Sequence, residues 1–272
     1  MTWSLSGKYP AIFEHELVGE EAKKLFKDAN ELLDKVEKES MMTVRGMCQL
    51  FPANSIGDDI EVYKDESRTE VIKVLHNLRQ QTHKPKGANY CLSDFIAPKQ
   101  SGKADWIGAF AVTGGIGERE LADQYKADGD DYNAIMIQAV ADRLAEAFAE
   151  CLHEKVRKEI WGYASEECLT NDDLIREKYQ GIRPAPGYAA CPEHTEKGSL
   201  WELMKVEDTI GMQLTSSYAM YPGASVSGWY FSHPESRYFA VAKIQQDQVD
   251  SYVERKGWDR SEIDKWLGPN ID

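Results

Sequence analysis

The residues best suited to chemistry lie in one short segment, Gln180–Lys197, whose composition is typical of a ligand loop rather than of a core element. Its three prolines fix the backbone φ angle and remove hydrogen-bond donors, while its two glycines permit close approach or a left-handed conformation. Arg183 offers a planar fork of donors suited to a carboxylate, and Tyr188 offers a ring that can cover a cation or a flat heterocycle. The segment predicts a clamp for a small molecule, with a rigid surface turn as the alternative.

Three other motifs could carry chemistry, and each has a simpler interpretation. Gly114–Gly117 lacks the Gly-x-Gly-x-x-Gly spacing of a nucleotide turn and reads as a plain turn. Cys191–His194 could be half of a zinc site, but no second pair has ligand spacing. Ser225 lacks the Gly-x-Ser-x-Gly elbow of a nucleophile, and no His/Asp set can be assigned to it. We therefore predict no catalytic side chain and no metal ligand.

The segment Arg183–Tyr188 also resembles the Arg-x-x-x-Gly-Tyr core of the reactivation domain of cobalamin-dependent methionine synthase, a C-terminal module that binds S-adenosylmethionine. The resemblance continues through Ala189–Glu196, Tyr221–Pro234, Asn89–Phe95 and Met1–Lys8. Because these stretches occur in the right order across essentially the whole chain, residues 1–272 are identified as a member of that family.

The resemblance implies a binding site for S-adenosylmethionine. Arg183 would hold the carboxylate, Gly187 would let the backbone approach the ligand without an intervening Cβ, and Tyr188 would pack against it. Two aromatic residues further along the chain would also contact the ligand, although ordinary sheet packing is the alternative for both. The residues implied are Arg183, Pro184, Ala185, Gly187, Tyr188, Tyr238 and Phe239.

Less specific expectations concern four further places in the sequence. Phe239 lacks the hydroxyl group often found at its position in the family. Glu146 and Glu177 fall where the family places acidic residues near the ligand cleft, but exposed helix charges are an equally good interpretation. The small-residue run Gly223–Gly228 would let another surface approach closely, and the resemblance suggests the corrin face of cobalamin.

The implied function is to support the reductive methylation of cob(II)alamin to methylcobalamin within a methyltransferase. The domain would present the methyl sulfonium of S-adenosylmethionine to cobalamin carried by a neighbouring domain, so its task is positioning. The expected partners are the cobalamin-binding domain of the same enzyme and flavodoxin or a flavin reductase as electron donor. Zinc would be needed only in the homocysteine module, which this partial chain lacks along with the folate and cobalamin modules.

The alternative function is a non-catalytic S-adenosylmethionine-binding sensor or docking domain. An Asp-x-His-x-x-Gly pattern encoded upstream would favour the enzyme, and this chain contains none. The family also carries a further N-terminal stretch, with an aspartate expected to bind the ligand's amino group, so Met1 resembles an internal position of a truncated protein. We therefore expect this chain to bind the ligand more weakly than one extended upstream.

Composition excludes several other classes. The chain has 272 residues, 42% of them hydrophobic and 29% charged, which is ordinary for a globular protein. Its net charge of −14 argues against nucleic-acid binding, which needs a basic surface. No run is long enough to cross a membrane, no signal pattern begins the chain, and five scattered cysteines indicate reduced thiols. A cytoplasmic location is the expectation.

The elements that must position these residues follow from hydrophobic spacing and turn residues. Helices are predicted at Glu20–Glu39, Glu66–Gln81, Asp131–Trp161 and Leu200–Thr209, with two short ones ending near Pro269. Strands are predicted at Thr43–Phe51, Asp59–Tyr63, Ala104–Thr113, Gln213–Met220, Ser227–Ser232 and Tyr238–Ile244, the last two as a hairpin. Because strands neighbour strands, we expect a single α+β domain with a largely antiparallel twisted sheet flanked by helices.

Overall fold

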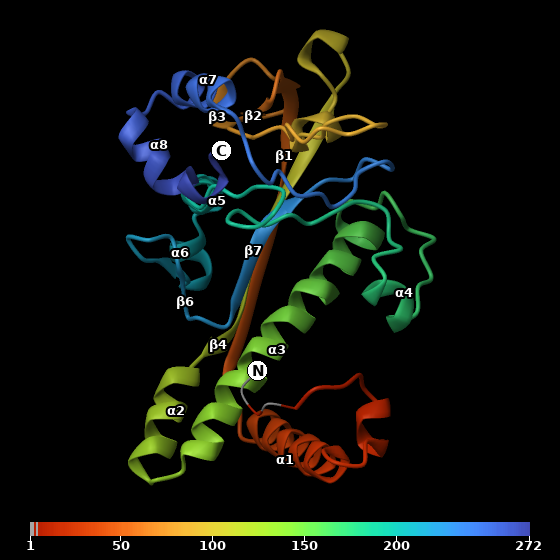
Figure 1. Ribbon diagram of the computed structural model, residues 1–272, viewed down its shortest axis with the longest axis vertical. Helices are drawn as coiled ribbons and strands as arrows, with labels where there is room; N and C mark the ends of the chain where they lie inside the picture. Colours follow the sequence, from red (N-terminus) through yellow and green to blue (C-terminus); the bar gives the residue numbers. More distant parts are fainter. Residues whose placement is uncertain (1–2, 4) are drawn as a thin grey trace.

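A five-stranded antiparallel sheet in the order β3-β2-β1-β4-β7 organises the computed structural model, which describes residues 3 and 5–272 (Figure 1). Its strands are β1 (Thr43–Ile56), β2 (Asp59–Tyr63), β3 (Val71–Leu75), β4 (Asp105–Ile116) and β7 (Ser225–Tyr230). A separate ribbon pairs β5 (Gln213–Leu214) with β6 (Met220–Tyr221). The predicted α+β class with an antiparallel sheet is confirmed. Of the stretch Met1–Lys8, residues 1, 2 and 4 lie outside the described part.

Helices cover both faces of the sheet and its two ends. In Figure 1 the long helix α3 runs beside β4 and β7, α1 and α2 lie at the lower end, and α7 and α8 lie at the upper left. None of the helices in the described part of the chain combines the length and apolar character that a membrane crossing requires. The helices are α1 (Gly19–Lys38), α2 (Glu118–Ala127), α3 (Asp131–Lys155), α4 (Asn171–Ile175), α5 (Glu196–Met204), α6 (Val206–Ile210), α7 (Gln246–Lys256) and α8 (Arg260–Leu267), with a π-helical turn at Val156–Ile160 and 3-10 turns at Ala11–Glu14, Leu92–Phe95, Lys99–Ser101 and Gly268–Asn270.

The side chains of β4 alternate in direction along the strand, and each face of the strand packs against a separate hydrophobic cluster. Phe110 and Val112 pack into the same cluster as Leu152 of α3. Ala109 and Ala111 belong to the cluster on the other face, which includes side chains of α5 and α6. The sheet is therefore a middle layer, with α3 against one face and α5 and α6 against the other.

The predicted helices at Glu20–Glu39 and Asp131–Trp161 are confirmed as α1 and as α3 with its π-helical extension. The predicted helix Leu200–Thr209 is present but divided, because Lys205 adopts a left-handed conformation (φ 51°) between α5 and α6. It also begins earlier than predicted, since α5 starts at Glu196.

The predicted helix Glu66–Gln81 is wrong. Its centre is the edge strand β3, which pairs with β2, and the residues that follow β3 form no helix. Val71, Val74 and Leu75 recur at helical spacing, but Val71, Ile72 and Val74 are β-branched and favour a strand. A short apolar run of this kind cannot be assigned by spacing alone.

The predicted hairpin between Ser227–Ser232 and Tyr238–Ile244 is also wrong. Strand β7 forms, but Tyr238–Ile244 does not return beside it. The outer edge of β7 is taken instead by Ile182–Pro184, and the returning segment crosses to Ala189, whose carbonyl accepts a hydrogen bond from the Val241 amide (2.8 Å). A strand has only two edges, and both edges of β7 are occupied.

Two strand boundaries and one turn also differ from expectation. The predicted strand Thr43–Phe51 continues to Ile56, so the turn into β2 is confined to Gly57 and Asp58. Within the predicted strand Gln213–Met220, only the two ends form strands, as β5 and β6, and a turn joins them. In Gly114–Gly117, only Gly117 lies outside β4, where it forms the turn into α2 with φ 92°.

Candidate functional site

The arginine bend, residues Arg183–Tyr188, is attached to the outer edge of β7. The Ile182 amide and carbonyl exchange hydrogen bonds of 3.0 Å with Phe231, and the Trp229 amide donates to the Pro184 carbonyl (2.9 Å). A Cβ on Gly228 would lie 2.5 Å from that carbonyl oxygen, so glycine is required for the bend to approach β7 so closely. The small-residue run thus has an internal role, which is to seat the bend.

A cavity of about 320 Å³ lies beside the bend and collects six of the seven predicted site residues. The seventh, Gly187, does not line it, but it sets the path of the bend. Its φ is +90°, and a Cβ there would lie 2.5 Å from the ring of His194. The predicted residues that line the cavity are Arg183, Pro184, Ala185, Tyr188, Tyr238 and Phe239.

Several lining residues were not predicted as ligand contacts from the sequence. Glu146 of α3 lines the cavity as the family resemblance implied, whereas Glu177 does not and lies exposed on the surface. The run from Ser225 to Ser227 lines it too, and the small side chains at those positions were the only sequence signal. Of the remaining lining residues, Ala189, Ala190 and Lys197 lie in the predicted ligand loop but were not singled out as contacts, and Met220 carried no sequence signal.

The guanidinium of Arg183 is held from one side by three residues. Its Nη1 donates to the Tyr179 hydroxyl (3.1 Å) and lies 3.1 Å from Nδ1 of His153, while Nη2 donates to Oε2 of Glu150 (2.7 Å). The Arg183 backbone amide donates to the Tyr238 hydroxyl (3.0 Å).

These bonds use three of the five N–H donors of the arginine side chain. The Nε–H and one N–H on Nη2 have no acceptor among residues 3 and 5–272. Nε and Nη2 share one edge of the planar group. That edge has the fork geometry with which arginine binds a carboxylate.

Burial fixes the protonation states around the guanidinium. It lowers the pKa of His153 to about 2, helped by the charges of Arg157 and Arg183. His153 is therefore neutral near pH 7, and because a guanidinium only donates, its Nδ1 must be the acceptor. For Arg183, burial alone would lower the pKa, but Tyr179, Tyr238 and Glu150 outweigh it and raise the pKa.

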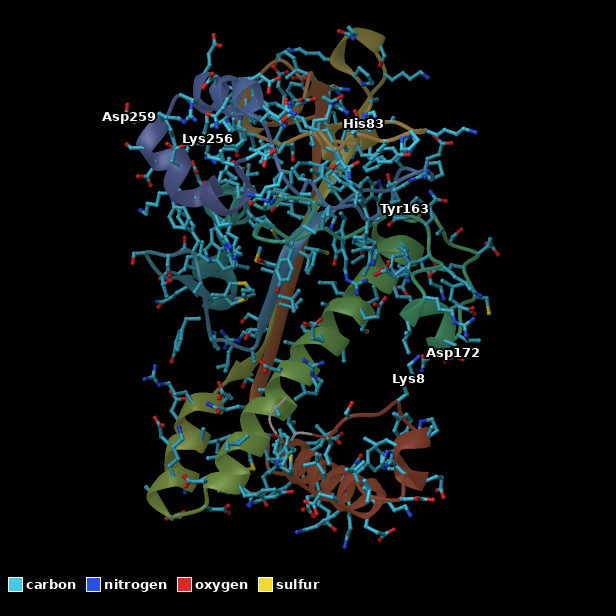
Figure 2. The ribbon with its side chains drawn as sticks, viewed as in Figure 1. Lys8, His83, Tyr163, Asp172, Lys256 and Asp259 are labelled. Atoms are coloured by element: carbon cyan, nitrogen blue, oxygen red, sulfur yellow. The ribbon has the colours of Figure 1, made fainter. Side chains whose placement is uncertain are left out.

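The far limb of the loop is fastened to α7 by a buried ion cluster around Lys256, which Figure 2 labels beside α7. The Lys256 ammonium contacts the Glu193 carboxylate and donates to Thr195 Oγ1 (2.7 Å) and Glu196 Oε1 (3.0 Å). Burial alone would lower the pKa of Lys256, but Glu196 and Glu193 raise it. The cluster fixes the residues that follow the bend.

The segment Cys191–His194 has a structural place in this loop. The Cys191 thiol is buried, and burial raises its pKa well above the ordinary value. His194 packs its ring against Gly187. No group of three or more His, Cys, Asp or Glu side chains in the described ranges is arranged to hold a metal ion.

Comparisons with known proteins agree with this fold. The family model described as "Vitamin B12 dependent methionine synthase, activation domain" matches residues 1–257. A crystal structure of the MetH reactivation domain bound to AdoHcy is similar with a TM-score of 0.97 and 66% sequence identity, over 100% of this chain and 83% of that chain. The chain belongs to the activation-domain family of vitamin B12-dependent methionine synthase.

Proposed function

We propose that this chain binds S-adenosylmethionine in the cavity beside the arginine bend and serves as the reactivation module of a cobalamin-dependent methionine synthase. The observation that carries the proposal is that the Nε–H and the second Nη2 N–H of Arg183 have no acceptor in the described part of the chain, while Arg183 lines a cavity together with Tyr238 and Phe239. Such an edge is suited to the carboxylate of an amino acid. The AdoHcy bound by the similar MetH domain has that group.

The size and lining of the cavity suit a nucleoside joined to an amino acid. Its volume of about 320 Å³ lies at the lower end of the range for small-molecule sites. Phe239, Val226 and three alanines supply apolar surface, while Glu146 supplies a carboxylate for the positive end of the ligand. Tyr188 is 70% exposed at the cavity, so its ring is available to pack against a ligand.

In the proposed reaction the chain orients the methyl donor. Arg183 would hold the carboxylate, and the bend would hold the adenosine end, so that the sulfonium methyl group projects out of the cavity. Cobalamin, carried by a neighbouring domain, would supply the metal that accepts the methyl group. A Cβ on Gly223 would meet no atom within 4 Å, so the Gly223–Gly228 run leaves room where a partner surface would approach.

The contribution to catalysis would therefore be positioning within a larger methyltransferase. Flavodoxin or a flavin reductase would donate the electron that reductive methylation requires. The homocysteine, folate and cobalamin modules would supply the remaining chemistry, including the zinc site.

The test is calorimetric titration of the chain with S-adenosylmethionine and, separately, with S-adenosylhomocysteine. We expect saturable binding of both at one site. Adenosine triphosphate is the matched control, because it carries the same adenosine but places phosphates where the amino acid would be. Absence of saturable binding for both sulfur ligands, or tighter binding of the triphosphate, would reject the proposal.

A further inference from the structure

A single carboxylate, Glu150, lies between two guanidinium groups behind the cavity. Its Oε2 accepts a hydrogen bond from Nη2 of Arg183 (2.7 Å), and its Oε1 is 3.9 Å from Nη1 of Arg157. Arg157 is fully buried and is held separately by Glu167, whose Oε1 accepts from Nη2 at 2.8 Å. Glu150 is therefore the charged partner of Arg183, while Arg157 has a partner of its own.

Two neutral side chains complete the seat of the Arg183 guanidinium, which we define as Glu150, His153 and Tyr179. The His153 ring is stacked on Tyr230 at a centroid distance of 5.0 Å and meets Tyr179 edge to face at 4.9 Å. Both neighbours are buried, so the seat is rigid. An arginine side chain has many rotamers when free, and this seat selects one of them.

Glu146 shows why that selection matters. It lies one helical turn before Glu150 on α3 and lines the cavity. Without Glu150, Glu146 would be the next carboxylate on the same helix face that the Arg183 side chain could meet. A pair formed there would occupy the donors that a ligand carboxylate needs.

From this arrangement we propose that Glu150 is a positioning residue for ligand binding: it holds the Arg183 guanidinium so that its Nε–Nη2 edge faces the carboxylate of the ligand. The inference deepens the proposed function and rests on it. A simple charge argument predicts the opposite effect, because removing Glu150 would leave the site more positive and more attractive to a carboxylate. We expect the effect of orientation on affinity to exceed the effect of charge, because a bidentate contact depends on the angle at which the guanidinium meets the carboxylate.

The test compares two ligands that differ only in the amino-acid end. S-adenosylhomocysteine carries the carboxylate, whereas 5′-methylthioadenosine has the same thioether and adenosine without it. For Glu150→Ala we expect calorimetry to show about a 10- to 100-fold loss of affinity for S-adenosylhomocysteine, the size of a lost hydrogen bond to a charged group. Affinity for methylthioadenosine should be unchanged.

Three further variants separate orientation from general damage. Glu154→Ala removes a carboxylate one turn further along α3, where the half-buried Glu154 pairs with Lys158 (3.4 Å) and does not line the cavity, and it should leave both affinities unchanged. In an Arg183→Ala background, Glu150→Ala should cause no additional loss, because its effect acts through the arginine. Glu150→Gln keeps an acceptor of the same shape and should retain part of the affinity, so it serves if the alanine variant does not fold.

The inference is overturned if a folded Glu150 variant binds S-adenosylhomocysteine as tightly as the parent or more tightly. It is equally overturned if both ligands lose affinity by the same factor, or if the Glu150 and Arg183 effects add. Failure of the parent chain to bind S-adenosylhomocysteine at all would instead reject the proposed function, and this inference with it.

Discussion

Two ion clusters hold the two limbs of one loop, and they differ in whether any of their donors remain available. In Figure 2 Lys256, the last residue of α7, lies on the left, and Tyr163 marks the opposite side, near the end of α3. The Lys256 ammonium is nearly enclosed, with Glu193 and Glu196 buried around it. The Arg183 side chain is 22% exposed and keeps one edge without a protein acceptor among the described residues.

A structural ion cluster and a binding site are distinguished by whether any hydrogen-bond donor remains without a protein partner. A buried ion pair with every partner in contact contributes to the path of the chain, and removing one member leaves a charge uncompensated. A cluster that holds a guanidinium by one side and leaves the other free is built to accept a further anion. If stability and ligand affinity divide between the clusters in this way, a variant at the closed cluster should lower stability and a variant at the open cluster should lower affinity.

The largest effect is expected on stability at the closed cluster. Lys256→Met leaves two buried carboxylates without their cation, so the free energy of unfolding should fall by about 3–5 kcal/mol. Urea denaturation measures it. Lys265→Met, which removes an exposed lysine paired with Glu262 at 3.5 Å, is the control and should cost less than about 1 kcal/mol. Similar losses for the two variants would show that the cluster is not a fastening.

At the open cluster we expect the main loss in binding. Arg183→Ala removes the carboxylate fork, so affinity for S-adenosylhomocysteine should fall by about 2–3 kcal/mol, the size expected for hydrogen bonds to a charged group. Arg237→Ala is the matched control, since Arg237 lies over the Tyr90 ring (5.2 Å) and does not line the cavity. Comparable losses in calorimetric titrations of the two variants would contradict the carboxylate contact.

The pH dependence of stability tests whether His153, one of the two neutral members of the seat, has a lowered pKa in the folded chain. His153 has a folded-state pKa of about 2 against an ordinary value of 6.5, so its contribution to stability is present above pH 6.5 and is lost as the pH falls toward 2. Between pH 7 and pH 5 the free energy of unfolding should fall by about 2 kcal/mol from this group alone. His153→Gln should remove that part of the dependence, as urea titrations of both proteins at the two pH values would show. Parallel pH curves would mean that folding does not lower the pKa of His153.

The sequence was sufficient to predict the arginine bend and the element that supports it. Prolines and glycines mark the bend between Gln180 and Lys197, and an apolar residue at every fourth position marks α3. The antiparallel character of the sheet also followed from the order of elements. These are local patterns, and local patterns can be read along the chain.

The seat of the guanidinium could not be predicted from the sequence. Glu150 and His153 lie on α3, far from Arg183 along the chain, and neither belongs to a recognisable motif. On a helix rich in charges, Glu150 and His153 have the same sequence appearance as exposed residues, and only the packing of Tyr179 and Tyr230 around them shows otherwise. The position of Tyr238 was misread for a related reason. Whether it returns beside β7 depends on which segment takes the free edge, and Ile182–Pro184 takes it. Competition for a strand edge has no signature in one segment alone.

The smallest effect should come from the hydroxyl that joins the bend to the returning segment. The Tyr238 hydroxyl accepts a hydrogen bond from the Arg183 amide and lies 3.1 Å from the Tyr179 hydroxyl, so it links the open cluster to the cavity wall. Tyr238→Phe keeps the ring and leaves one amide without its acceptor, which should lower affinity for S-adenosylhomocysteine by about 1 kcal/mol. Tyr221→Phe, which changes an exposed ring outside this cavity, should leave the affinity unchanged. If the loss for Tyr238→Phe appeared equally for methylthioadenosine, the hydroxyl would support the bend as a whole; a loss confined to the amino-acid ligand would place it with Glu150 in orienting Arg183.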